Sequence, residues 1–80
     1  GRLSRFLITI SYRPGMLKAI TEVVAEHRAN ILQVFHQRDT MHTGFGETEV
    51  ELDLETRGHE HADEISRALL AKGLRVERLS

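Results

Sequence analysis

Alternating apolar residues near the start of the chain give way to a helical pattern. Phe6, Ile8 and Ile10 predict a strand over residues 5–11 that has one face in a core. Apolar residues then recur every three or four positions, which predicts an amphipathic helix that runs to about His27. The apolar stripe of this helix consists of Leu17, Ile20, Val23 and Val24.

An extended pattern returns over residues 30–38. Successive side chains of a strand point to opposite faces, so odd and even positions are expected to separate. Residues 39–46 contain two glycines and predict a loop that closes a hairpin with the next strand. We expect one face to carry Leu32, Val34 and His36, and the other Ile31, Gln33 and Phe35.

The alternation is most regular over residues 47–56. Thr48, Val50, Leu52 and Leu54 are expected to lie in the core of the domain. The positions between them are acidic, which predicts a solvated outer face on this strand. These acidic residues are Glu49, Glu51, Asp53 and Glu55.

A second helix is predicted to start at Gly58, with acidic residues near its positive N-terminal end. The segment Lys72-Gly73-Leu74 predicts a glycine cap of the Schellman type at its end. Residues 75–79 then form a last short strand, with Leu74 and Val76 facing inward. The buried stripe of the helix is expected to contain Ala62, Ile65 and Leu69, with Ala68 and Leu70 beside it.

These elements follow one another in the order β-α-β-β-α-β. Right-handed crossovers and a sheet covered on one side make this a ferredoxin-like α+β sandwich. We expect one four-stranded antiparallel sheet, in the order 4-1-3-2, with both helices on one face. The chain forms one domain over residues 1–80.

Charge and composition exclude several classes of partner. Eleven basic and twelve acidic residues are well mixed, which gives no footprint for nucleic acid or for a membrane surface. No cysteine is present, so disulfides and thiolate chemistry are excluded, and we expect a cytoplasmic location. The chain begins with Gly1, and we expect it to be a fragment of a larger enzyme.

The turn at Pro14 and Gly15 is the candidate for function. Pro14 suits the first turn of the following helix, because a backbone N–H there would have no acceptor within the helix and proline lacks this N–H. The free N–H groups of that turn are able to hold a carboxylate. Asn30, at the far end of the same helix, offers an amide to the same ligand. Alternatively, Asn30 closes the helix in a left-handed conformation, because Arg28 stands where glycine is favoured.

Catalytic and metal sites find little support in the sequence. His59 and His61 are two residues apart at a helix start, so they do not converge on one ion. The acidic strand face is expected to be wet, which leaves its carboxylates unsuited to acid–base catalysis. Lys18 and Lys72 both fall on exposed helix positions, so neither is a cofactor lysine. We therefore expect neither a catalytic residue nor a bound metal or cofactor in this chain.

With these motifs in place, the chain resembles an ACT domain, and more narrowly the C-terminal ACT domain of threonine dehydratase (threonine ammonia-lyase). The resemblance covers nearly the whole chain. It depends on segments 13–17, 29–32, 36–38, 49–52, 54–61 and 72–76, together with Gly1-Arg2 at the start. Two positions depart from the family: Tyr12 stands where members often carry Asp, and Arg28 where many carry Gly.

The resemblance implies a regulatory domain that binds a small amino acid between two copies of itself, and isoleucine or valine is favoured by the apolar turn. It also implies a parent enzyme that uses pyridoxal phosphate, in its catalytic domain, to deaminate threonine. The alternative is a structural dimerisation module without a small ligand, which the departures at Tyr12 and Arg28 favour. The ligand-binding residues implied are Arg13, Pro14, Gly15, Met16, Leu17, Asn30 and Ile31.

Overall fold

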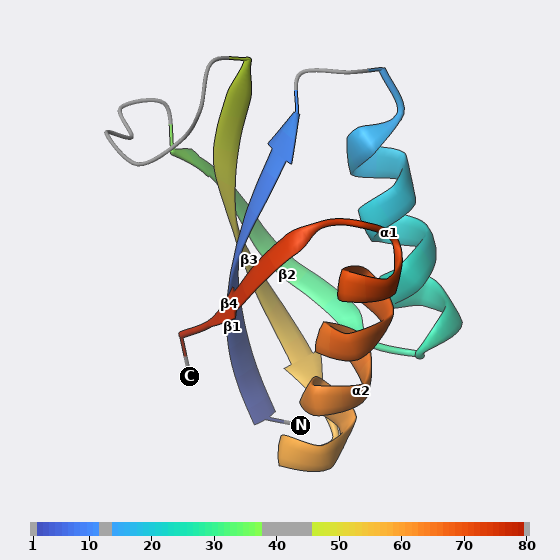
Figure 1. Ribbon diagram of the computed structural model, residues 1–80. Coiled ribbons are helices and arrows are strands. Elements are labelled where there is room, and N and C mark those ends of the chain that lie inside the picture. Colours follow the sequence, from blue (N-terminus) through green and yellow to red (C-terminus); the bar gives the residue numbers. More distant parts are fainter. Residues whose placement is uncertain (1, 12–13, 38–45, 80) are drawn as a thin grey trace.

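The computed structural model describes residues 2–11, 14–37 and 46–79 of the chain. Four strands and two helices follow one another in the predicted order, β-α-β-β-α-β (Figure 1). The loop predicted over residues 39–46 and the strand end at Arg38 lie outside the described residues, except for Gly46. The elements are β1 (Arg2–Ser11), α1 (Met16–Glu26), β2 (Asn30–Gln37), β3 (Glu47–Thr56), α2 (His59–Ala71) and β4 (Arg75–Arg78).

The sheet has the strand order β2-β3-β1-β4, and each neighbouring pair is antiparallel. Both helices cover the same face, as Figure 1 shows. The predicted ferredoxin-like topology is therefore confirmed. The first strand is longer than expected, since it begins at Arg2 rather than at residue 5.

The core lies between the helices and the inner faces of β1 and β3. The apolar residues predicted to face inward on β3, from Val50 to Leu54, are at most 1% exposed. The stripe of α2 is also buried, but Leu70, which was expected beside it, is 51% exposed. The largest fully buried side chains are Phe6, Ile8, Ile20, Val23, Val24, Val50, Leu52, Leu54, Ile65 and Leu69.

The acidic face of β3 is only partly solvated, and the prediction was wrong for Asp53, which is 3% exposed. Because β3 lies inside the sheet, Asp53 has Arg5 of β1 opposite it on one side and Gln33 of β2 on the other. The Nε atom of Arg5 lies 3.6 Å from Oδ1 of Asp53. The pKa of Glu51 is raised above its ordinary value. The largest cause is desolvation of its carboxyl group, and the hydrogen bond and negative charge of Asp53 add to it.

The faces of β2 differ from the prediction at its first residues. Val34 and His36 share a face, as expected, because they pair with Leu52 and Val50. Ile31, however, pairs with Leu54, and a bulge follows before Gln33 pairs with Asp53. The extra residue in the bulge separates Ile31 from the face of Gln33, with which the simple alternation had grouped it.

Both helices end in the same capping motif, but only one uses glycine. After α2, the N–H groups of Gly73 and Leu74 donate to the carbonyls of Leu70 and Leu69, which confirms the predicted Schellman motif. After α1, Arg28 takes the left-handed position with a φ of 58°. Asn30 is therefore the first residue of β2 and does not close the helix.

Pro14 does not lie in the first helical turn, contrary to the prediction. It lies in the turn before α1, and Gly15 is the N-cap residue, with a φ of 88°. Glycine adopts this left-handed conformation at little steric cost, whereas residues with a Cβ atom adopt it less readily. The turn between β1 and α1 therefore depends on Gly15 more than on Pro14.

Leu69 and Leu70 are neighbours in α2 and provide a matched test of the core. Replacing Leu69, which is fully buried, with alanine should lower the free energy of unfolding by about 2–5 kcal/mol, because a cavity remains. Leu70→Ala should change it by about 0.5 kcal/mol or less, since this side chain is exposed. Urea unfolding of both variants checks the packing, and equal losses would contradict it.

Candidate functional site

The turn before α1 presents free backbone donors to solvent. The Gly15 carbonyl accepts the first helical hydrogen bond, from the N–H of Ala19 at 3.0 Å. Among the described residues, no side chain caps this end of the helix. The N–H groups of Met16, Leu17 and Lys18 lie in the first turn, where the helix offers no acceptor. Together with the helix dipole, they favour a negatively charged group such as a carboxylate.

A mainly apolar hollow of about 330 Å³ lies beside this turn. The turn supplies three of the predicted residues, Gly15, Met16 and Leu17. His36 comes from β2 and was not predicted as a site residue, although it shares a face with Val34 in the sequence pattern. Arg13 lies outside the described residues. The lining is Ile10, Ser11, Gly15, Met16, Leu17, His36 and Thr48.

Asn30 and Ile31 lie at the other end of the same domain. Helix α1 has 11 residues, so it separates the turn at Gly15 from the start of β2 by about 16 Å. Figure 1 shows the two regions at opposite ends of α1. A small amino acid does not span this distance within one copy of the chain. The structure therefore does not bring the predicted residues together in a single domain.

The side chain of Asn30 borders a second, polar hollow of about 550 Å³. Its Nδ2 atom donates a hydrogen bond of 3.1 Å to Oε1 of Glu55 on β3. Three arginines from separate segments also line this hollow, and the sequence reasoning did not group them. The lining is Arg2, Arg28, Asn30, Glu55, Thr56 and Arg57.

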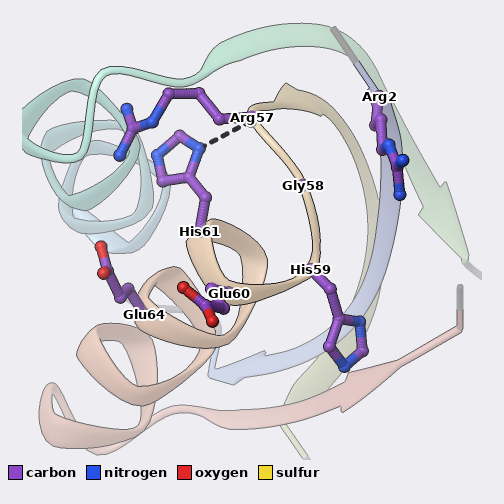
Figure 2. A pocket seen from close by; sticks show the side chains of 7 residues that line it. All are labelled: Arg2, Arg57, Gly58, His59, Glu60, His61 and Glu64. Atoms are coloured by element: carbon purple, nitrogen blue, oxygen red, sulfur yellow. Dashed lines mark hydrogen bonds between the residues drawn. The ribbon is translucent and has the colours of Figure 1, made fainter.

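His61 connects the start of α2 with the end of α1. Its Nδ1 atom accepts a hydrogen bond from the backbone N–H of Arg57 at 2.9 Å, shown in Figure 2. Since Nδ1 is an acceptor, Nε2 carries the proton and donates to the carbonyl of His27 at 2.5 Å. His61 is 5% exposed, and its bond to the His27 carbonyl holds the segment that leads into Arg28 and Asn30. These two hydrogen bonds give His61 a structural role.

A hollow of about 400 Å³ lies next to His61, and Figure 2 shows its side chains. Acidic and basic groups are mixed in it, with no dominant charge. It is lined by Arg2, Arg57, Gly58, His59, Glu60, His61 and Glu64. Within residues 2–11, 14–37 and 46–79, no three side chains of His, Asp or Glu are grouped as metal ligands.

Neither lysine of this chain lies in a hollow described above, which is where the cofactor implied for a parent enzyme would need one. Pyridoxal phosphate requires a lysine within a binding cavity. Lys18 and Lys72, the two lysines of the sequence, are both exposed on or just after helices, and neither lines a hollow described above. No helix in the described part of the chain is long and apolar enough to cross a membrane.

Comparison with known proteins gives sequence relatives of one kind. No family model matches the chain. It is 47% identical over 64 residues to an L-threonine ammonia-lyase of Thermotoga maritima, covering 80% of this chain and 16% of the relative. It is 35% identical over 79 residues to an L-threonine ammonia-lyase of Geobacter sulfurreducens, covering 99% of this chain and 20% of the relative. The chain thus spans about a fifth of the length of these curated relatives.

Solved structures with the same fold include a domain described as an ACT domain. The ACT domain of a GTP pyrophosphokinase from Chlorobium tepidum superposes with a TM-score of 0.69 at 20% identity, and 96% of each chain is covered. A prephenate dehydratase from Streptococcus mutans gives a TM-score of 0.76 at 17% identity, covering 96% of this chain and 40% of that one.

The chain therefore has the fold of an ACT domain. Its sequence relatives make the resemblance more specific: it is similar to an ACT domain of the threonine dehydratase type.

The connection through His61 can be measured directly. His61→Leu leaves the Arg57 N–H and the His27 carbonyl without their partner, so the free energy of unfolding should fall by about 1–3 kcal/mol. His59→Leu is the matched control, because the His59 side chain is 78% exposed and should contribute about 0.5 kcal/mol or less. Equal effects of the two substitutions in urea unfolding would contradict this role of His61.

Proposed function

We propose that the chain is a non-catalytic regulatory domain of a pyridoxal-phosphate-dependent threonine dehydratase, which binds a small amino acid between two copies of itself. The observation that carries the proposal is the separation of Gly15 from Asn30 along α1. The free N–H groups of the turn lie at one end of the domain, and the Asn30 amide lies at the other. One ligand reaches both only if a second copy supplies one of them.

Strand β2 is suited to join the two copies. It pairs with β3 on one side and lies at the edge of the described sheet on the other. An edge strand offers its unused backbone groups to another strand. Apolar side chains along it are also exposed, which favours burial against a partner. These residues are Ile31, Leu32, Val34 and Phe35.

Antiparallel pairing of two β2 strands places the start of one strand beside the end of the other. Asn30 is at the start of β2, and His36 is near its end. The hollow beside Gly15 is lined by His36, so Asn30 of a second copy comes close to this hollow. This arrangement supports a ligand site with two halves, one from each copy.

The chemistry of the hollow supports a branched aliphatic amino acid as the ligand. The N–H groups after Gly15 are suited to its carboxylate, and the Asn30 amide is suited to a second polar group. Ile10, Met16 and Leu17 offer an apolar surface for the side chain. This apolar surface favours isoleucine and valine over threonine, and the polar side chains of the same lining are Ser11, His36 and Thr48.

Regulation follows if the ligand favours one arrangement of the two copies over another. A coupling free energy of about 1–3 kcal/mol between distant sites is typical of such control. The altered arrangement of the two copies would act on the catalytic domain of the parent enzyme, which would hold the pyridoxal phosphate. A dimerisation module that binds no ligand is the second candidate, because the exposed apolar edge of β2 supports association without a ligand.

A titration of the chain with isoleucine, valine and threonine, followed by amide chemical shifts, tests the proposal. Saturable shifts are expected at residues 15–17 and 29–32. Gly15→Val should weaken the binding by about tenfold or more, because valine disfavours the left-handed turn that aligns the N–H donors.

Gly73→Val is the matched control for this substitution. Gly73 has a φ of 86°, close to the 88° of Gly15, and open space surrounds both positions. Both variants should lose a similar free energy of unfolding, roughly 1–2 kcal/mol, but only Gly15→Val should lose affinity. A dimer that shows no shifts with any of the three amino acids would instead identify the dimerisation module.

A further inference from the structure

We propose that the hollow between Arg2, Arg28 and Arg57 binds an oxyanion, either a carboxylate or a phosphate group. The three arginines come from three segments that are distant in the sequence. Arg2 lies at the start of β1, Arg28 between α1 and β2, and Arg57 between β3 and α2. All three line the same hollow of about 550 Å³ at one end of the sheet. Figure 2 shows Arg2 and Arg57 on either side of the turn before α2.

Among the described residues, Arg2, Arg28 and Arg57 form no ion pair, and neither does Arg67 of α2. Arg5, Arg75 and Arg78 each lie 3.6 Å or less from a carboxylate oxygen. Within the described part of the chain, no carboxylate oxygen lies within 4.0 Å of a side-chain nitrogen of Arg2, Arg28 or Arg57.

The carboxylate that lines this hollow already has a partner. Glu55 is the only acidic residue among those lining the hollow, and it accepts the hydrogen bond from Asn30. Three guanidinium groups and one carboxylate leave a formal charge of +2 on this lining, in a chain of net charge −1. A site with this excess of positive charge favours an anion.

Arg28 adds a second argument, because its backbone conformation favours glycine. Its φ of 58° is left-handed, and its N–H and that of Ala29 make both bonds of the Schellman motif. Glycine at this position would remove the steric cost of Cβ without changing the cap. The guanidinium group gives this position a function that glycine lacks.

Guanidinium groups bind carboxylates and phosphates through paired hydrogen bonds, which explains the class of ligand. The carboxylate of an amino-acid effector and the phosphate of a separate metabolite present the same chemistry. Asn30 also lines this hollow and belongs to the proposed amino-acid site. An amino-acid effector would therefore contact both the arginines and a Gly15 turn, whereas a separate phosphate would contact the arginines alone. The proposal does not depend on the amino-acid site, since a phosphate ion alone tests it.

The experiment compares inorganic phosphate, isoleucine and sodium chloride at equal ionic strength, with amide chemical shifts as the readout. Phosphate is expected to give saturable shifts at residues 2, 28, 30 and 57 that chloride does not reproduce. Arg28→Gly should weaken this binding by about fivefold, the loss typical of an exposed ion pair. The same substitution should raise the urea midpoint, so a misfolded variant does not explain the loss.

Arg67→Ala is the control, because Arg67 is an exposed arginine of α2 that lies outside the hollow. It should leave the phosphate affinity unchanged. If isoleucine shifts the same amides and Arg28→Gly weakens isoleucine binding too, the oxyanion is the carboxylate of the effector. If only phosphate shifts these amides, the oxyanion is a separate ligand. The proposal is overturned if neither compound gives saturable shifts there, or if Arg28→Gly weakens binding no more than Arg67→Ala.

Discussion

The antiparallel pairing of β1 with β3 is the interaction on which the other features depend. It runs in register over ten residue pairs, from Arg2 with Thr56 to Ser11 with Glu47. Because β1 takes β3 on one side and β4 on the other, β2 is left with a single neighbour. The same pairing buries the alternate residues of both strands against the helices. It also places Asp53 between two neighbouring strands, where its side chain is buried. An exposed apolar edge at β2 is a direct result.

In the proposed dimer, that edge brings the two ends of the domain together. The turn at Gly15 and the amide of Asn30 lie about 16 Å apart along α1, which is too far for one small ligand in one copy. Pairing of two β2 strands reverses their directions and brings opposite ends together. Our proposal links association to ligand binding, because the proposed ligand site is complete only in the pair. Such linkage is what a regulatory domain requires.

Much of the fold follows from the sequence, because its strands and helices have strong periodic patterns. The alternation over residues 47–56 predicts the observed bounds of β3, and the glycine after Lys72 predicts the observed cap. The bulge in β2 is not predictable in this way, since a single extra residue leaves no local signal. The burial of Asp53 depends on the strands beside it, which the pattern of its own strand does not contain.

The candidate site was less predictable for the same reason. The turn residues form a continuous motif, so Gly15, Met16 and Leu17 are found from the sequence, and they line one hollow. His36 reaches that hollow from another strand. The arginines at positions 2, 28 and 57 are grouped only by folding. Arg28 is recognisable in the sequence as a departure from glycine, but its left-handed conformation appears only in three dimensions.

The central claim, that two copies each supply half of the ligand site, is tested most directly by mixing two defective chains. Gly15→Val impairs one half and Asn30→Ala the other, so each variant alone should bind isoleucine about tenfold or more weakly than the wild-type chain. Random pairing of equal amounts should restore about a quarter of the wild-type binding sites, because half of the dimers are mixed and each contains one intact site. A mixture that binds no isoleucine, although mixed dimers form and the wild-type chain binds, would contradict the account.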